Sequence, residues 1–318
     1  MSSRDLPQPV PGRVAVVDCG TNSIRLLVAE RGPAGGLVDV HRRLEIVRLG
    51  QGVDATGAFH PEALARTFSA VDRYAEVIQA AGVPLSRTRF VATSAARDAG
   101  NRTEFFDGIR QRLGVPADVI SGDTEARLSF SGALSGLRPV AEPVLVMDIG
   151  GGSTELVLGD AHGEVGQAVS LDVGSVRLTE RFLPGSPPAA DDLQQASDHV
   201  DRLLVGSGID LSTVGSWFGV AGTVTTLASV QLGLPGDDLH ALHGAVLRPV
   251  DLRALLSRLS GLSAAQIRTI STMHPQRADV ITAGALIATR VAAAVPATEL
   301  VVSATDILDG LALELLGS

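Results

Sequence analysis

The chain contains one cysteine among its 318 residues, which excludes an internal disulfide and any zinc site built on thiolates. No uncharged apolar run reaches the roughly 18 residues that a membrane span needs, and the N-terminal segment MSSRDLPQPVPGR lacks the apolar centre of a secretory signal. The best late candidate, Val280 to Val295, is interrupted by Arg290. We therefore expect a cytoplasmic globular protein, with Met1 to Gly12 as a disordered leader.

Basic residues are fewer than acidic ones, and the formal net charge is −9. This charge argues against a protein that coats nucleic acid through a general basic field. It is compatible with an anionic substrate, because a few local arginines together with Mg²⁺ can bind phosphates on an acidic protein. The pattern GxxxxGK[ST] is absent, which excludes a P-loop. The single cysteine, Cys19, is expected to be a small buried residue rather than a reactive thiol.

The most informative feature present is an internal repeat. The segment VAVVDCGTNSIRLLVAE recurs in altered form as VLVMDIGGGSTELVLGD, which begins at Val144. The repeat aligns four residues of the first copy with four of the second, namely Asp18, Gly20, Ser23 and Leu26 with Asp148, Gly150, Ser153 and Leu156. Each copy predicts two apolar strands joined by a turn that exposes backbone N–H groups. The repeat indicates two related halves, whose turns would hold a phosphate chain if they faced one another.

Strands and helices alternate in the same order in both halves. In the first half we expect strands at 14–17, 24–30, 38–48, 88–93 and 119–120 and helices at 61–81, 102–113 and 126–134. In the second half we expect strands at 144–147, 155–158, 166–172, 217–220 and 299–302 and helices at 190–204, 250–259, 264–270, 278–295 and 306–316. This order is typical of an α/β fold with sites at strand ends. We place the domains at 1–138 and 139–305, with the C-terminal helix, 306–318, packing back on the first.

Two glycine-containing segments have the composition of phosphate-binding turns. Three consecutive glycines follow Asp148 in DIGGGSTE and let backbone N–H groups approach an anion. Asp148 and Glu155 flank this turn, and two carboxylates beside phosphate oxygens suit Mg²⁺. The run AGTVTT lies at an expected strand-to-helix junction, where its N–H groups would point at a phosphate, although Thr223 could instead be a simple N-cap.

Other polar residues are ambiguous when they are taken alone. Glu125 could be a solvated acid at a helix start, which the positive end of the helix favours. Arg97, in TSAARDAGN, could be only a surface charge. His240 and His243 form HxxH without a third ligand, which favours hydrogen-bonded histidines over a metal site.

Five segments in order, DCGTNSIRLL, TSAARDAGN, ISGDTEARLSFSGA, VMDIGGGSTEL with SLDVGSVRLTE, and GVAGTVTTLA, closely resemble the exopolyphosphatase and guanosine pentaphosphate phosphohydrolase family. RADVITAGALI and VSATDILDGLALE resemble its closing segments. The resemblance implies a duplicated actin-like ATPase fold of the ribonuclease H-like kind that sugar kinases, Hsp70 and actin share. It also implies an active site in the cleft between the domains, and a homodimer.

The resemblance assigns roles to individual positions. Glu125 matches the glutamate that orients and deprotonates the attacking water. Asp148 and Glu155 match the acids that bind Mg²⁺, or another divalent cation, and support hydrolysis, and Asp18 would be a further carboxylate on the metal side. Six positions match residues around the terminal phosphates: Asn22, Ser23, Arg97, Gly151, Gly152 and Ser153.

The sequence thus predicts a magnesium-dependent exopolyphosphatase that removes terminal phosphate from polyphosphate. The chain ends where long family members continue into an all-helical region, so we expect short polyphosphate chains as substrate. The alternative is a guanosine pentaphosphate (pppGpp) 5′-phosphohydrolase, which uses the same catalytic parts. A second alternative is a non-catalytic protein that binds phosphate or nucleotide. We expect neither nucleic acid nor a membrane as partner.

Overall fold

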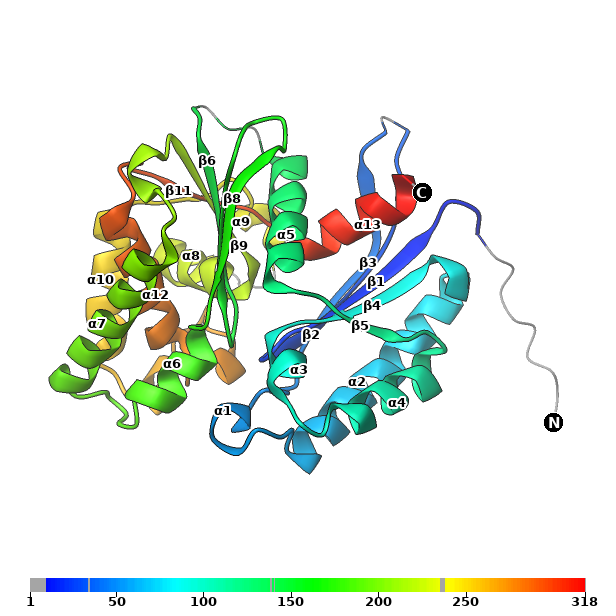
Figure 1. Ribbon diagram of the computed structural model, residues 1–318, viewed down its shortest axis with the longest axis horizontal. Helices are drawn as coiled ribbons and strands as arrows, with labels where there is room; N and C mark the ends of the chain where they lie inside the picture. The colour runs from blue at the N-terminus through cyan, green and yellow to red at the C-terminus, as the bar shows by residue number, and fades with distance from the viewer. Residues whose placement is uncertain (1–9, 34, 138, 140, 235–237, 318) are drawn as a thin grey trace. The chain divides into compact units, whose positions relative to one another are not determined.

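The computed structural model describes residues 10–33, 35–137, 139, 141–234 and 238–317 (Figure 1). By their contacts these residues form two compact units. The first comprises the chain up to Ser121 together with the residues from Leu308 onward, and the second extends from Gly122 to Ile307. Most of the expected leader, Met1 to Gly12, lies outside the described residues. Among the described helices, none combines the length and the apolar character that crossing a bilayer requires.

The first unit contains a five-stranded sheet in the order β3-β2-β1-β4-β5. Its strands are β1 (Val14–Cys19), β2 (Ser23–Arg31), β3 (Leu37–Ile46), β4 (Thr88–Ala92) and β5 (Ala117–Val119). Its helices are α1 (Val53–Thr56), α2 (Pro61–Ala80), η1 (Leu85–Arg87), α3 (Ser94–Asp98), α4 (Arg102–Leu113) and α13 (Ile307–Gly317). Helices α2 and α4 cover one face of the sheet and α13 covers the other (Figure 1).

Helices α2 and α13 are held against the sheet of the first unit by different contacts. Proline occupies the first turn of α2, and Leu64, Val71 and Ile78 recur every seven residues on its buried face. Helix α13 is fixed by an ion pair, because Asp309 is 1% exposed and accepts from Arg42 Nη2 of β3 at 2.6 Å. Burying both sides of the sheet accounts for the wholly buried strand β1.

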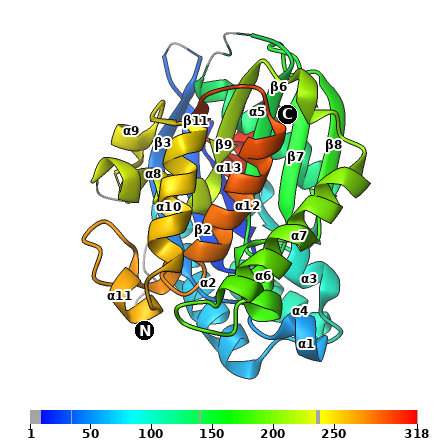
Figure 2. The ribbon, with the colours of Figure 1, turned by 90° about the vertical axis from the view of Figure 1, so that its left-hand side faces the viewer.

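The second unit contains a six-stranded sheet in the order β10-β11-β9-β6-β7-β8. Its strands are β6 (Val144–Ile149), β7 (Thr154–Gly159), β8 (Val165–Leu171), β9 (Ser216–Val220), β10 (Val246–Leu247) and β11 (Leu300–Val302). Its helices are α5 (Gly122–Gly136), α6 (Ser175–Phe182), α7 (Ala190–Ser207), η2 (Leu211–Thr213), α8 (Ala221–Leu232), α9 (Leu239–Leu242), α10 (Pro249–Ser260), α11 (Ala264–Ile267), η3 (Pro275–Arg277) and α12 (Ile281–Ala294). Helix α5 lies on one face, and α8, α10 and α12 lie on the other (Figures 1 and 2).

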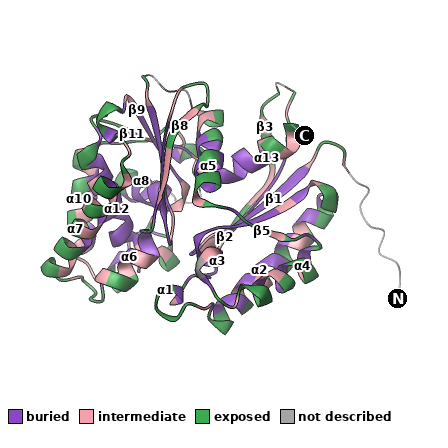
Figure 3. Ribbon diagram, in the orientation of Figure 1, coloured by how far each residue is buried: buried purple, intermediate pink, exposed green. Residues whose placement is uncertain are grey.

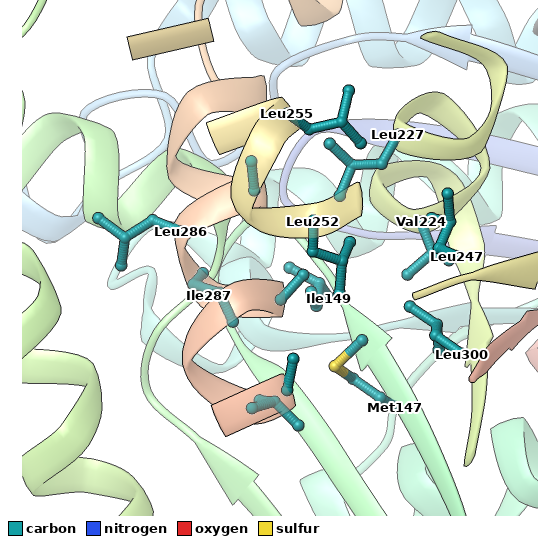
Figure 4. Close-up of a cluster of buried hydrophobic side chains, with 14 of the residues drawn as sticks. Met147, Ile149, Val224, Leu227, Leu247, Leu252, Leu255, Leu286, Ile287 and Leu300 are labelled. Carbon is teal, nitrogen blue, oxygen red and sulfur yellow. The ribbon is translucent and has the colours of Figure 1, made fainter. Parts of the chain in front are cut away.

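The core of the second unit lies between its sheet and the helices α8, α10 and α12. Met147 and Ile149 of β6 gather there with leucines of α10 and α12, including Leu252 and Leu286 (Figure 4). Strands β6 and β7, which form a hairpin, are buried along almost their whole length. Such continuous burial is what a strand covered on both faces requires. Exposed residues lie on the outward sides of helices such as α2 and α7 (Figure 3).

The two sheets confirm the predicted duplicated α/β fold. In each unit a three-stranded antiparallel part, β3-β2-β1 or β8-β7-β6, continues into parallel strands, β4-β5 or β9-β11. Sequence reasoning missed the short helices α3 and α6, which are only five and eight residues long.

The boundary between the units differs from the expected one at 138/139. Helix α5 contacts β6, β7, β8 and β9, so it belongs with the second sheet. Its apolar face, which includes the buried Ala126, Phe130 and Ala133, packs in one cluster with Val146 and Val157 of the β6–β7 hairpin. The chain therefore passes from the first unit to the second between Ser121 and Gly122, where α5 begins.

Candidate active site

The DIGGGS turn joins β6 to β7 in the second unit, as predicted. Gly150 N–H donates to Ser153 O at 3.0 Å and closes the turn. The carbonyls of Gly150 and Gly151 accept from the first N–H groups of α6 at 2.9–3.0 Å. Among the described residues, no backbone carbonyl accepts from the N–H groups of Gly151, Gly152 or Ser153. The turn therefore has backbone donors suited to an anion.

Helix α6 approaches the turn so closely that only glycine fits at its N-cap. A Cβ on Gly174 would lie 2.5 Å from C and O of Gly151 and 2.7 Å from Gly152 N. Gly174 has φ −137°, so the requirement is steric rather than conformational. This close approach holds the carbonyls of the turn in place.

Substituting Gly174 by Ala is expected to destabilise the protein by about 1–3 kcal/mol, because the obstructing atoms are backbone and cannot rotate away. Urea unfolding measures the effect. Gly166→Ala is the matched control, since its Cβ would meet nothing closer than Leu158 O at 3.7 Å. Equal stability of the two variants would contradict the packing described for α6.

Two buried carboxylates face each other beside this turn. Asp148 and Glu155 are cross-strand partners in the β6–β7 register and are 6% and 1% exposed. Ser129 Oγ of α5 donates to Asp148 Oδ2 at 3.2 Å, and Ser170 Oγ of β8 donates to Glu155 Oε1 at 2.7 Å. Like charges directly opposite each other destabilise a sheet, so this arrangement favours bound cations.

Glu125 lies in the first turn of α5 and is 9% exposed. It precedes Ser129 by four residues, so both side chains are on one face of the helix. The start of α5 also packs against β8, whose Ser170 is hydrogen-bonded to Glu155. A Cβ on Gly122 would lie 2.5 Å from Ser170 Cβ. The structure thus brings Glu125, Asp148 and Glu155 to the same end of the second sheet.

The first unit repeats the turn with different side chains. Gly20 N–H donates to Ser23 O at 3.0 Å, the same bond and distance as in the second unit. Asn22 is 7% exposed, and its Oδ1 atom is buried without a hydrogen bond among the described residues. Its backbone oxygen accepts from Val47 N at 3.0 Å and from Arg48 N at 2.9 Å.

The position that corresponds to Glu155 is occupied by a cation. Asp18 pairs with Arg25 in the β1–β2 register, and its Oδ2 accepts from Arg25 Nη2 at 2.6 Å and Nε at 3.2 Å. The charge of Asp18 is therefore compensated by its cross-strand neighbour. Asp18 thus differs from Asp148 in having a cationic cross-strand neighbour. Its expected place on the metal side stays a prediction.

Arg97 is positioned by a segment bonded to the turn of its own unit. Thr93 N–H donates to Cys19 O at 3.2 Å, and the hydroxyls of Thr21 and Ser94 lie 2.8 Å apart. Arg97, at the end of α3, donates from Nη1 to Ile120 O at 2.9 Å. The first unit thereby holds the start of the Arg97 helix against the turn that carries Asn22 and Ser23. Cys19 is buried, as expected. The pKa of its thiol is raised mainly by this burial and further by the nearby charge of Asp18.

The AGTVTT segment starts α8 directly after β9, as predicted. Thr223 is not the N-cap: its hydroxyl donates to Ile149 O at 2.7 Å and ties the helix to the end of β6. Sequence reasoning missed Arg277, whose guanidinium lies against the helix start, where a Cβ on Gly222 would be 2.1 Å from Nη2. A guanidinium beside a helix N-terminus suits phosphate oxygens.

Two residues with a strained backbone conformation lie beside the first turn and at the start of α8. Arg48 and Ala221 are the non-glycine residues with positive φ in the described part of the chain, at 51° and 62°. Arg48 donates to the first turn through its N–H, and Ala221 opens α8. Left-handed backbone at such residues concentrates at functional sites.

One histidine of the HxxH pair, His243, is hydrogen-bonded through both ring nitrogens. His243 Nδ1 accepts from Ala304 N at 3.1 Å, and its Nε2 lies 3.0 Å from Gly136 O at the end of α5. His243 is thus a hydrogen-bonded histidine, as the missing third ligand indicated. Over the described ranges, no group of three or more His, Cys, Asp or Glu side chains could hold a metal ion.

Comparisons with known proteins find relatives that match almost the whole chain. Exopolyphosphatase 2 of Mycobacterium tuberculosis is 45% identical over 319 residues, which cover 96% of this chain and 99% of that protein. The crystal structure of an exopolyphosphatase-like protein matches with 38% identity and a TM-score of 0.88, covering 95% of this chain and 97% of that one. The Aquifex aeolicus Ppx/GppA protein matches with 29% identity and a TM-score of 0.80 over 96% and 98% of the two chains. The model of the Ppx/GppA phosphatase family matches residues 27–318, and the chain belongs to this family.

Proposed function

We propose that this protein is an exopolyphosphatase that hydrolyses the terminal phosphate of inorganic polyphosphate and prefers short chains. The observation that carries the proposal is the convergence of Glu125, Asp148 and Glu155 beside the glycine turn of the second unit. The relative named exopolyphosphatase, which matches almost the full chain, supports the same reaction.

The residues present fit a divalent cation. Asp148 and Glu155 offer hard carboxylate oxygens, which Mg²⁺ prefers, and phosphate oxygens and water would complete its coordination. Bound there, Mg²⁺ would neutralise charge on the phosphate oxygens. Asp18 fits less well because Arg25 already compensates its charge.

Hydrolysis of a phosphoric anhydride needs positioning and charge compensation rather than covalent help. In the proposed reaction, Glu125 orients a water and accepts its proton while the water oxygen attacks the terminal phosphorus. The bond from that phosphorus to the bridging oxygen breaks, so orthophosphate and the shortened polyphosphate, which leaves with the bridging oxygen and its electron pair, are the products. The N–H groups of Gly151, Gly152 and Ser153 hold the oxygens of the phosphate under attack. In the same proposal, Asn22, Ser23 and Arg97 of the first unit bind phosphates of the substrate.

Orthophosphate release by the purified protein in Mg²⁺ tests the proposal. Short polyphosphate, long polyphosphate and pppGpp are compared at equal concentrations of terminal phosphate, with chelated enzyme as the metal-free sample. Fastest release from short polyphosphate, lost on chelation, is the expected result. Release from pppGpp alone would overturn the substrate assignment and favour the pppGpp 5′-phosphohydrolase. A cytoplasmic location and a homodimer stay predictions, which fractionation and light scattering would test.

A further inference from the structure

Two serine hydroxyls next to the acidic pair have no role in the reaction described above. We propose that Ser129 and Ser170 are positioning residues, which fix the carboxylate planes of Asp148 and Glu155 for a divalent cation. The inference rests on the metal-binding part of the proposed function. It does not depend on which phosphate substrate is hydrolysed.

Ser129 acts from α5. It is completely buried, and its Oγ donates to Asp148 Oδ2 at 3.2 Å. Because it follows Glu125 by one helical turn, the same hydrogen bond also sets the distance between the helix start and Asp148. A hydroxyl in a site closed to solvent cannot be replaced by bulk water, so its loss leaves the carboxylate less restrained.

Ser170 acts from β8. It lies opposite Glu155 in the β7–β8 register, and its Oγ donates to Glu155 Oε1 at 2.7 Å. Gly122, at the start of α5, is close enough that its Cβ would lie 2.8 Å from Ser170 Oγ. The hydroxyl therefore lies between Glu155 and the first turn of the helix that carries Glu125.

The two hydrogen bonds oppose the repulsion between the acids. Asp148 and Glu155 face each other across the strand pair, so each would gain by rotating away from the other. A hydrogen bond to one oxygen of each carboxylate restricts that rotation. Partners of this kind, which hold the ligands of a metal, typically change metal affinity or activity by about 10–100-fold when they are mutated.

The test uses Ser129→Ala and Ser170→Ala, with Ser135→Ala as the matched control. Ser135 is on the same helix as Ser129, but its hydroxyl donates to Gly132 O of its own helix. Binding of Mn²⁺, a probe for the Mg²⁺ site, is followed by electron paramagnetic resonance without substrate. Each test variant should bind Mn²⁺ about tenfold more weakly, and the control should match the wild type. The Mg²⁺ concentration for half-maximal phosphate release should rise in parallel, with a smaller change in kcat at saturating Mg²⁺.

Thermal unfolding without metal shows whether each variant is folded. If Ser129→Ala does not fold, the Mn²⁺ affinity of Ser170→Ala alone tests the inference. Unchanged Mn²⁺ affinity in the folded variants would overturn the inference, as would a wild type that binds no Mn²⁺. If the wild type binds Mn²⁺ and the variants bind it weakly, but no polyphosphate is hydrolysed, the inference stands and the proposed function fails.

Discussion

Glu125→Gln should lower the rate of orthophosphate release by about 10²–10⁴-fold, the range that a general base contributes. Glutamine keeps the size and the hydrogen-bonding capacity of the side chain but cannot accept the proton of the attacking water. Because the metal carboxylates are untouched, KM for polyphosphate should change much less than kcat. The measurement is steady-state phosphate release from short polyphosphate at saturating Mg²⁺.

Asp123→Asn is the matched control for Glu125→Gln. Asp123 is in the same first turn of α5 and loses the same charge, but it is exposed. Its rate should stay within about twofold of the wild type, because an exposed charge contributes little across solvent. If wild type and Glu125→Gln released phosphate equally slowly, the catalytic assignment would fail and a non-catalytic phosphate-binding protein would be favoured.

Gly132→Ala should destabilise the second unit strongly. A Cβ at Gly132, in the middle of α5, would lie 1.8 Å from Asp306 O and 2.5 Å from its carbonyl carbon. These are backbone atoms, so either the helix or the segment before α13 must shift. We expect a loss of at least about 3 kcal/mol, the upper end of what overpacking usually costs. Urea unfolding followed by circular dichroism gives the value.

Gly206→Ala is the control for Gly132→Ala. It shows what replacing a helical glycine does to stability where no clash results. Gly206 is exposed near the end of α7, and a Cβ there would meet nothing within 4 Å. Alanine is the better helix former by about 1 kcal/mol, so this variant should be as stable as the wild type or more so. Stability of Gly132→Ala within 1 kcal/mol of the wild type would show that the segments do not pack this closely.

The sequence allowed most of the secondary structure and the principal carboxylates to be predicted. The repeat led directly to both hairpins, because a turn that requires glycine between apolar strands leaves a strong local signal. Asp148 and Glu155 were found from the glycine turn that they flank, whereas Glu125 was singled out only through the family resemblance. The structure places all three in the second unit. Their roles in metal binding and catalysis stay predictions.

What could not be predicted depends on contacts between distant segments. Helix α6 is only eight residues long and starts where its N–H groups meet the carbonyls of Gly150 and Gly151. Ser129 and Ser170 reach the acids only through the packing of α5 and the register of β8, which leave no local pattern. The domain boundary was misplaced for the same reason, since the apolar face of α5 does not reveal which sheet it covers.

The matching hydrogen bonds of Gly20 and Gly150 show that one turn geometry accommodates either an Asp–Arg or an Asp–Glu pair beside it. The side chain opposite the aspartate can therefore change without altering the backbone hydrogen bond that closes the turn. After a duplication, one copy could exchange an acid for a base at the position of Arg25 without losing its backbone structure. A change at this one position therefore decides whether the carboxylate beside the turn is compensated by a cation, as Asp18 is, or faces a second carboxylate, as Asp148 does.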